Sequence, residues 1–232
     1  MPRPGLLLVF SDPGAGVSEE EFTDWYDNEH VPQRLDIPAF QSWVRWKAAD
    51  NAKPTWAASY DLTSYEATQQ PPYTTLAVTR SEREKRIIQD LGVLERRTYE
   101  LMDVPVPPPA AHFDPRKPSR FISFISTEVK EGVDEILNRW YEEEHLPMLS
   151  KVEGWLRSRR FVLKDWTRTG VEGKADDMPV PKYLAVHEWE SIDAVRSPEV
   201  QKSWDTPLRT EVNKVTERRQ LRMMEYYKHW ER

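Results

Sequence analysis

Two glutamate–histidine pairs in this chain have the residue types and the spacing that proton chemistry needs. Glu29-His30 and Glu144-His145 lie 115 positions apart, and each pair stands inside a stretch that reads Trp-Tyr-x-x-Glu-His-x-Pro. An imidazole has an unperturbed pKa of about 6.5, so it can give or take a proton near neutral pH. We therefore predict that His30 and His145 are catalytic acid–base residues and that the two glutamates have a structural role.

Aromatic residues accompany each pair. Trp25 and Tyr26 precede the first pair, and Trp140 and Tyr141 precede the second. About one helical turn separates them from the histidine, so these rings could line the same pocket and bind a substrate. Trp-Tyr pairs at helical spacing also pack commonly in protein cores. Substrate binding and core packing are both consistent with the pattern.

The spacing of apolar residues predicts that both motifs lie on amphipathic helices. In the second copy, apolar residues recur every three or four positions from Val133 to Tyr141. Continuing this pattern at about 100° per residue puts Glu144 in the middle of the apolar face and His145 at its edge. Pro147 should then end the helix. We expect the helix C-terminus and the adjacent glutamate to favour the charged form of the imidazole.

Residues on predicted strands could complete the two pockets. His187 shares a strand face with Tyr183 by the period of two, and the equivalent position in the first half is Tyr60. Arg160 could orient a carboxylate or phenolate of the substrate, or it could form an ion pair. We interpret His187 as a third catalytic residue, or as a hydrogen-bonded core residue, and the other three as substrate-binding residues.

The two halves are expected to differ in function. Only the second half pairs its motif histidine with another histidine, so His145 and His187 could act as an acid and a base in one pocket. We therefore expect the chemistry to be concentrated in the second half. His145→Ala should then reduce turnover far more than His30→Ala.

A duplicated motif at a fixed offset indicates two repeats. The first repeat, residues 1–103, has predicted strands at 5–11, 39–48, 55–62 and 94–103, and the second, residues 119–232, follows the same order. Residues 104–118 contain six prolines and should form an extended linker. We interpret the extra residues within 166–181 as a mobile lid over one pocket, and the charged run 80–86 as a solvated helix face.

The order strand-helix-strand-strand-helix-strand predicts an α+β fold of two ferredoxin-like repeats. Each repeat would form a four-stranded antiparallel sheet with its helices on one face. Packing the two repeats sheet to sheet would bury both bare faces and create an intramolecular α/β-barrel. The continuous apolar run from Gly5 to Ser11 should be a strand that is buried on both faces.

Composition excludes several classes of protein. A net charge of −6 without a basic stripe argues against nucleic-acid binding, and the absence of cysteine excludes disulfides and thiolate metal sites. Metal-ligand motifs and glycine-rich phosphate loops are also missing, so we expect no metal and no cofactor; heme, which a single histidine can bind, stays open. The short apolar run near the N-terminus predicts neither a signal peptide nor a membrane span, so we expect a cytoplasmic location. The expected partner is a small-molecule substrate, and the chain should be a pseudo-dimeric monomer or a homodimer.

With these residues the chain resembles the dimeric α/β-barrel superfamily, and specifically its EthD-like branch, as two copies fused in tandem. The resemblance rests on the motif at 25–32 and 140–147, each time between the first and second predicted strands. It implies a cofactor-independent enzyme of secondary or aromatic metabolism, a lyase or isomerase of the dehydratase or cyclase type. Such an enzyme would use a histidine to move protons on a polyketide-like or aromatic small molecule. A non-catalytic small-molecule-binding or stress-response barrel is the alternative.

Overall fold

The structure, a computed structural model, describes residues 2–173 and 178–232. The chain divides into two compact units. Unit 1 consists of Met1–Leu101, Leu163–Val180 and Tyr227–Arg232, and unit 2 consists of Met102–Val162 and Pro181–Tyr226. The proline-rich segment 104–118 lies in unit 2, and two strands, β6 and β8, have residues in both units. The domain boundaries at 103 and 119 stay a prediction.

Unit 1 is built from four strands of its own and short helices. In chain order its elements are β1 (Gly5–Asp12), α1 (Glu19–Trp25), a π-helical turn (Tyr26–His30), α2 (Pro32–Leu35), β2 (Trp43–Ala48), β3 (Trp56–Leu62), two 3₁₀ turns (Tyr65–Gln69 and Tyr73–Ala77), α3 (Glu82–Asp90) and β4 (Val93–Leu101). The strand β1 pairs with β3 on one side and with β4 on the other. All eight of its residues are buried, which confirms the prediction made from its apolar run.

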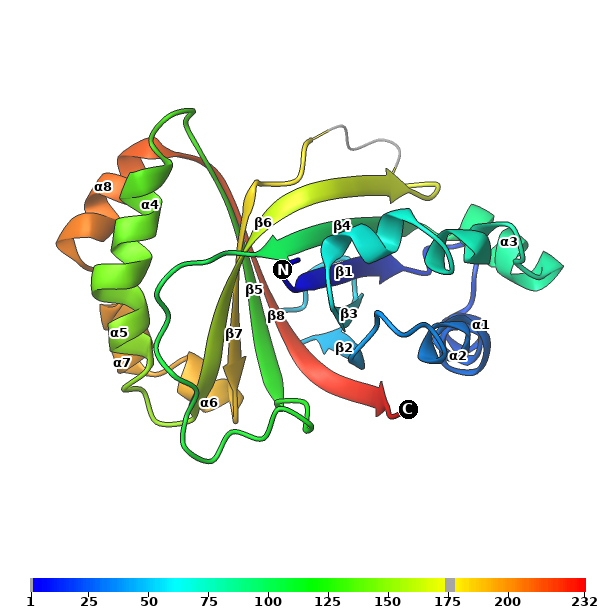
Figure 1. Ribbon diagram of the computed structural model, residues 1–232, viewed down its shortest axis with the longest axis horizontal. Helices are drawn as coiled ribbons and strands as arrows, with labels where there is room; N and C mark the ends of the chain where they lie inside the picture. Colours follow the sequence, from blue (N-terminus) through cyan, green and yellow to red (C-terminus); the bar gives the residue numbers. More distant parts are fainter. Residues whose placement is uncertain (1, 174–177) are drawn as a thin grey trace. The chain divides into compact units, whose positions relative to one another are not determined.

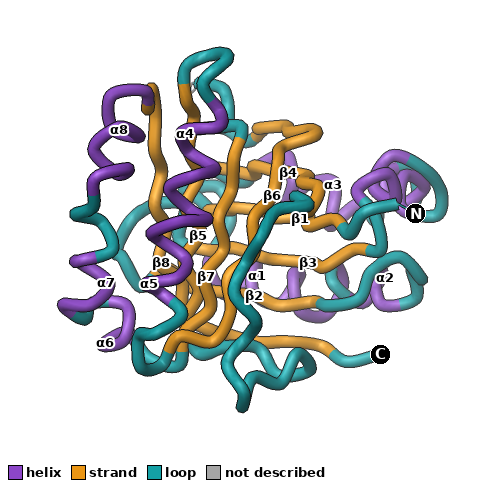
Figure 2. Tube along the Cα trace, turned by 60° about the vertical axis from the view of Figure 1, so that its left-hand side comes forward, coloured by secondary structure: helices purple, strands orange, loops and turns teal. Residues whose placement is uncertain are grey.

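Unit 2 follows a similar order. Its elements are β5 (Phe121–Val129), α4 (Asp134–Arg139), a π-helical turn (Trp140–His145), α5 (Leu146–Leu149), β6 (Trp155–Thr169), β7 (Tyr183–Trp189), α6 (Ile192–Val195), α7 (Pro198–Lys202), α8 (Pro207–Val215) and β8 (Thr216–Trp230). The helices α4, α5 and α8 lie along one face of the sheet formed by β5, β7 and β8 (Figure 1, Figure 2). Leu137, Trp140 and Val212 bring apolar side chains from this helical layer into the core.

The predicted pair of ferredoxin-like repeats packed as an α/β-barrel is wrong. The strands form one closed, antiparallel, eight-stranded β-barrel in the order β1-β3-β2-β8-β5-β7-β6-β4. The reason lies in β6 and β8, which are 15 residues long each. Their C-terminal parts continue into unit 1, where Thr169 bonds through Oγ1 to the Leu94 carbonyl. The edge strands are thus paired by hydrogen bonds, so the sheets do not end as separate four-stranded layers.

Both copies of the repeated motif form a π-helical turn. The Val31 N–H bonds to the Tyr26 carbonyl at 3.0 Å, five residues back, and the Leu146 N–H bonds in the same way to Tyr141. The extra residue in the turn rotates the following side chains relative to a regular α-helix. His145 is consequently buried at 1% exposure, whereas Glu144 is half-buried. The expectation of Glu144 at the centre of the apolar face and His145 at its edge is therefore wrong.

The motif prolines do not end the helical segment. Pro32 begins α2, and α5 continues through Pro147. A proline lacks the N–H that an α-helix requires, and its ring clashes with the carbonyl four residues earlier. The wider π-helical turn directly before each proline accommodates both effects, so one more helical turn can follow.

Residues 166–173 of the predicted lid are anchored by strand pairing and backbone hydrogen bonds. Residues 166–169 belong to β6, and the backbone N–H groups of Val171, Glu172 and Gly173 bond to the carbonyls of Leu91 and Gly92 at 2.8–3.0 Å. Gly170 adopts a φ of +102°, and a Cβ at this position would lie 2.5 Å from the Gly92 carbonyl oxygen, so a glycine is needed for this close approach. Asp176 and Asp177, which contributed to the lid hypothesis, lie outside the described residues.

Among the helices of the described residues, none combines the length and the apolar character that a membrane span requires.

A buried arginine connects the motif of unit 1 to its sheet. Arg45 on β2 is 1% exposed, and its guanidinium forms an ion pair with Asp27 of the π-helical turn. The group also lies over the rings of Tyr26 at 4.5 Å and Trp56 at 4.6 Å. Lys228 near the end of β8 bonds to the other Asp27 oxygen at 3.0 Å. Removing this carboxylate would leave a buried cation without its counterion.

We predict that Asp27→Ala lowers the free energy of unfolding by about 3–5 kcal/mol, the usual cost of breaking a buried ion pair. Chemical denaturation followed by tryptophan fluorescence measures this change. Glu19→Ala is the matched control, because Glu19 pairs with Lys47 at the surface and should contribute less than about 1 kcal/mol. Equal effects of the two substitutions would show that the buried pair has no special role.

Candidate functional site

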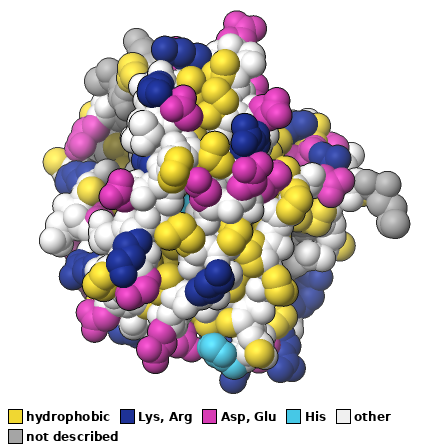
Figure 3. All heavy atoms as spheres, turned by 90° about the vertical axis from the view of Figure 1, so that its left-hand side faces the viewer, with side chains coloured by type: hydrophobic (Ala, Val, Ile, Leu, Met, Phe, Trp, Pro, Cys, Tyr) yellow, Lys and Arg dark blue, Asp and Glu magenta, His cyan; other side chains and the backbone are white. Residues whose placement is uncertain are grey.

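Each unit contains a ligand-sized cavity, and each cavity is reached by the histidine of one motif. The cavity of unit 2 has a volume of about 310 Å³ and is lined by Ser123, Ile125, His145, Leu149, His187, Trp189, Val195, Arg196, Val200, Gln201, Trp204, Leu221 and Met223. The cavity of unit 1 has a volume of about 260 Å³ and is lined by Leu7, Val9, His30, Arg34, Tyr60, Thr68, Tyr73, Thr74, Leu76, Ala77, Arg80, Ile88, Leu94 and Arg96. Figure 3 displays one outer face of the molecule, on which acidic, basic and hydrophobic side chains are interspersed.

His145 is held in a defined orientation and tautomer. Its Nδ1 lies 3.2 Å from the Ser203 carbonyl oxygen. A carbonyl can only accept a hydrogen bond, so Nδ1 carries the proton and Nε2 retains a lone pair. The ring stacks on Trp140 with centroids 4.3 Å apart and meets the Trp204 ring edge-on at 5.2 Å. These contacts fix the imidazole at the cavity wall.

His187 contacts His145 edge-on, with ring centroids 5.7 Å apart and an angle of 76° between the ring planes. Its Nδ1 is 2.7 Å from Ser158 Oγ, which accepts a bond from Trp155 Nε1 at 3.0 Å. The His187 Nε2 is buried and has no hydrogen-bond partner among the described residues. An unsatisfied buried polar atom at a cavity wall is a position where a ligand group can bind.

Both imidazoles of unit 2 are neutral at physiological pH. Burial lowers the pKa of His145 well below its usual value, and the neighbouring His187 acts in the same direction. Burial and the Arg160 guanidinium lower the pKa of His187 to about 3. The expectation of a charged imidazole stabilised by the adjacent glutamate is wrong, because Glu144 instead accepts a bond from the Leu208 N–H at 3.2 Å.

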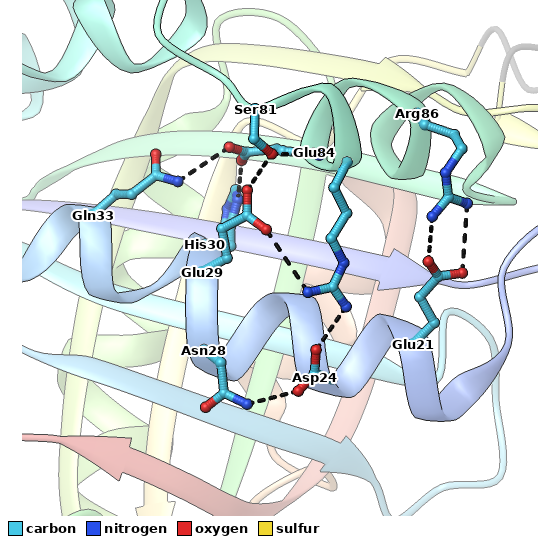
Figure 4. Close-up of polar contacts among 10 residues, drawn as sticks. Glu21, Asp24, Asn28, Glu29, His30, Gln33, Ser81, Glu84 and Arg86 are labelled. Carbon is cyan, nitrogen blue, oxygen red and sulfur yellow. Dashed lines mark hydrogen bonds and ion pairs between the residues drawn. The ribbon is translucent and has the colours of Figure 1, made fainter.

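In unit 1 the motif histidine has a carboxylate partner. His30 Nδ1 lies 2.7 Å from Glu84 Oε1, and Gln33 donates to Glu84 Oε2 at 3.3 Å. Figure 4 shows that Glu84 comes from α3, His30 from the π-helical turn of the motif and Gln33 from α2. Ser81, the N-cap of α3, bonds to both Glu29 and the Glu84 N–H, which strengthens the connection between the helices.

The pKa shifts of His30 and Glu84 determine which of the two side chains carries a charge. Burial and the Arg34 guanidinium lower the pKa of His30 to about 3, although the bond to Glu84 acts against this shift. Burial alone would raise the pKa of Glu84, but the hydrogen bond from His30 and the charge of Arg34 bring it below its usual value. A neutral imidazole therefore donates its Nδ1–H to an ionised carboxylate, and its Nε2 keeps a lone pair.

The structure brings some of the predicted site residues together. His145 and His187 line the cavity of unit 2, and His30 and Tyr60 line that of unit 1. The remaining six residues do not line either cavity. Four of them are the motif aromatics, which pack against the histidine rings: Trp25, Tyr26, Trp140 and Tyr141. Tyr183 bonds to Asp134 at 2.6 Å. Arg160 bonds to Asn138 at 2.8 Å and lies over the Tyr141 ring.

Several residues of the two sites escaped the sequence analysis. Glu84 was placed on a solvated helix face, but it is 1% exposed. The capping box Ser81-x-x-Glu84 was the available signal, because it marks the start of a helix whose next turn buries Ile87. Ser158 and Ser203 had no comparable signal, since their roles depend on strands and turns distant in sequence.

No protein-family model matches this chain, and no curated protein matches it. Solved structures share its fold at low identity. An anthrone oxidase-like protein is 11% identical with a TM-score of 0.63, over 99% of this chain and 93% of that one. A candidate monooxygenase of Fusobacterium nucleatum is 8% identical with a TM-score of 0.56, over 98% and 94%. A heme-binding protein of Thermus thermophilus is 11% identical with a TM-score of 0.54, over 98% and 92%.

These similarities establish the fold and correct three expectations. The neighbours are antiparallel eight-stranded barrel proteins, so the resemblance to a tandem EthD-like protein is wrong. Their names are those of an oxidase-like protein and a monooxygenase, which point toward oxidoreductases, so the expectation of a lyase or isomerase is corrected as well. None of these names connects the fold to polyketide metabolism, cyclases or dehydratases. The coarser expectation of a protein that binds or converts small molecules agrees with them.

Heme does not fit the residues present in unit 2. A volume of about 310 Å³ lies at the lower end of the range for ligand pockets and suits two or three fused rings better than a four-pyrrole macrocycle. Heme also carries two propionates, and Arg196 is the single lysine or arginine among the described residues that line the cavity. Among the residues that the structure describes, no cluster of three or more histidine, aspartate or glutamate side chains could hold a metal ion.

The lowered pKa of His187 predicts a specific pH dependence of stability. Between pH 6.5 and about 3 the unfolded histidine binds a proton that the folded one does not. The free energy of unfolding should therefore fall as the pH falls through this window, by up to about 1.4 kcal/mol per pH unit for this group. His187→Gln should show a smaller slope in denaturation measured at several pH values. His112→Gln, at an exposed position, should keep the slope of the parent protein. Equal slopes in all three proteins would contradict a buried neutral His187.

Proposed function

We propose that this protein is an oxidoreductase of the oxidase or monooxygenase type that acts on a small aromatic molecule in the cavity of unit 2. One observation carries the proposal: two neutral imidazoles, 5.7 Å apart, meet in a cavity whose other walls are mainly apolar. The names of the neighbouring structures, above all the anthrone oxidase-like protein, favour oxidation over other reactions of aromatic compounds.

The cavity walls favour a flat, largely apolar substrate. Trp189 and Trp204 contribute aromatic surface, and aliphatic side chains and a thioether complete the wall: Ile125, Leu149, Val195, Val200, Leu221 and Met223. Apolar walls bind through the hydrophobic effect, and aromatic side chains add stacking contacts with an aromatic ligand. A few polar groups in such a cavity then determine how the ligand is oriented.

The two histidines offer complementary hydrogen-bonding groups. His145 presents an acceptor, because its Nδ1–H is bound to Ser203. For His187, Ser158 Oγ already accepts from Trp155, and its hydroxyl hydrogen has no other acceptor in the described part of the chain. Donation from Ser158 to His187 Nδ1 leaves the proton of His187 on Nε2 as a donor. A substrate with a hydroxyl and a neighbouring oxygen acceptor satisfies both imidazoles.

The proposed reaction uses dioxygen as the oxidant. A dihydroxyaromatic substrate would transfer two electrons and two protons to dioxygen, which gives a quinone and hydrogen peroxide. His145 Nε2 would receive a hydroxyl proton as the electrons leave the ring, and it would pass the proton to the reduced oxygen. Burial makes an imidazolium unfavourable here, so the proton is not retained on the histidine.

Binding without turnover is a second candidate function. The low pKa of both histidines favours it, because weakly basic imidazoles are poor proton acceptors but good hydrogen-bonding groups. In this case the cavity would bind the same class of aromatic molecule. The two functions differ in one measurable way, since binding consumes no oxygen.

We expect oxygen consumption with hydroxyaromatic compounds of two or three fused rings, measured with an oxygen electrode. His145→Gln should reduce the rate by about 10²–10⁴-fold, the usual contribution of an acid–base residue. His30→Gln, which changes the other cavity, and His112→Gln, at the surface, are the matched controls and should keep the rate.

The outcomes separate the two candidates. Calorimetric binding of these compounds without oxygen consumption would support the binding protein and reject the oxidoreductase. Loss of activity in His30→Gln alone would place the reaction in unit 1. Neither binding nor turnover across the compounds would reject both functions.

A further inference from the structure

The cavity of unit 1 differs in chemistry from the cavity of unit 2. Three arginines line it, Arg34 from α2, Arg80 from the segment before α3, and Arg96 from β4. No aspartate or glutamate occurs among the described residues that line this cavity. Such a cluster is unusual in a chain with a net charge of −6. The reaction proposed for unit 2 does not use these residues.

The arginines have no carboxylate partner in the described part of the chain. Arg34 is 6% exposed, and its NH1 donates to the His30 backbone carbonyl. The Nε of Arg96 is buried and makes no hydrogen bond with any described residue. A buried guanidinium is normally paired, because removing a charge from water is costly. Arg45 follows this rule through its ion pair with Asp27, whereas the buried Arg160 bonds to the Asn138 amide instead.

Glu84, the carboxylate that bonds to the lining residue His30, forms no ion pair with the three arginines. Glu84 already accepts bonds from His30 on one oxygen and from Gln33 on the other, as Figure 4 shows. The position of Glu84 is also fixed by the first turn of α3, because its own N–H bonds to Ser81. Its single charge compensates part of the positive charge at the cavity and leaves the rest without a counterion.

Two of the arginines also lie beside the same aromatic ring. The guanidinium carbons of Arg34 and Arg96 are 5.8 and 5.6 Å from the Tyr73 ring centroid. Tyr73 in turn stacks on Phe40 at 5.5 Å, so the ring is held in place. Two positive charges beside one ring repel each other, and an anion in contact with both would offset this repulsion.

We propose that the cavity of unit 1 binds a small organic carboxylate. Arg34, Arg80 and Arg96 hold the carboxylate, for which the planar guanidinium group offers paired donors. The body of the ligand lies against the apolar wall formed by Leu76, Ile88 and Leu94. His30 Nε2, which retains its lone pair because Nδ1–H is bound to Glu84, accepts a hydrogen bond from a hydroxyl or amine on the ligand.

A carboxylate with an apolar body fits better than a purely inorganic anion. Six of the lining residues are aliphatic: Leu7, Val9, Leu76, Ala77, Ile88 and Leu94. Leu94 and Arg96 are two positions apart on β4, so their side chains lie on the same face of the strand. An apolar and a cationic group are therefore neighbours at the cavity wall. A volume of about 260 Å³ accommodates a single substituted ring.

Isothermal titration calorimetry with benzoate, benzamide and inorganic phosphate tests the proposal. Benzoate should bind, benzamide should bind at least about tenfold more weakly because it lacks the charge, and phosphate should bind more weakly because it lacks the apolar body. The same series with His145→Gln excludes the cavity of unit 2 as the source of the signal, since that substitution should leave benzoate binding unchanged.

Substitutions then assign the site. Arg96→Gln should weaken benzoate binding by about tenfold or more. Without ligand, the same change should raise the Tm, because it removes a half-buried positive charge whose Nε is buried without a hydrogen-bond partner. Arg86→Gln is the matched control: Arg86 lies on α3, outside the cavity, and pairs with Glu21. If Arg96→Gln fails to fold, Arg80→Gln at its half-buried position provides the same test.

Four results would overturn the proposal. Equal binding of benzoate and benzamide would show that the charge is irrelevant. Stronger binding of phosphate than of benzoate would exclude the class of ligand. Unchanged benzoate affinity in both arginine variants, or absence of any binding, would exclude the site itself.

Discussion

A proline two positions after each motif histidine is the constraint on which both cavities depend. It cannot donate a backbone hydrogen bond, and its ring excludes the regular α-helical path of the preceding turn. The chain responds with a π-helical turn, Tyr26–His30 in one unit and Trp140–His145 in the other. This turn directs the histidine into the unit and against the tryptophan that precedes it, with ring centroids 4.7 Å apart for His30 and 4.3 Å for His145. A regular helix would have placed the neighbouring glutamate there.

The π-helical turn has different surroundings in the two units. His30 donates to a carboxylate, whereas His145 donates to a backbone carbonyl. The cavity beside His30 is lined by three arginines, and the cavity beside His145 by tryptophans, aliphatic side chains and a second histidine. A carboxylate partner makes an imidazole a better hydrogen-bond acceptor at Nε2, and a backbone partner leaves it less basic. The same duplicated element thus borders two cavities with different linings.

Local patterns in the sequence identified the elements but not the way they assemble. The apolar run of β1 predicted its burial, and the repeated motif located the two histidines that reach the cavities. The π-helical turn could not be read from the helical wheel, because the wheel assumes a constant rotation per residue. Closure into one barrel was missed because it depends on how far β6 and β8 extend, and the end of β6 carries polar residues that resemble a loop. Glu84 was missed because the sequence of a charged run does not show which of its carboxylates is buried in the fold.

The distribution of unit 1 along the chain has a consequence for synthesis on the ribosome. Tyr227–Arg232 belong to this unit, and they contact its first hundred residues through Lys228 with Asp27 and through Arg232 with the Leu35 carbonyl. Residues 1–101 are therefore translated long before their last partner strand, and at the usual rates of synthesis the delay is on the order of ten seconds. During that interval the edge of β2 has no neighbour on one side, a state that exposes a nascent chain to aggregation and to chaperones.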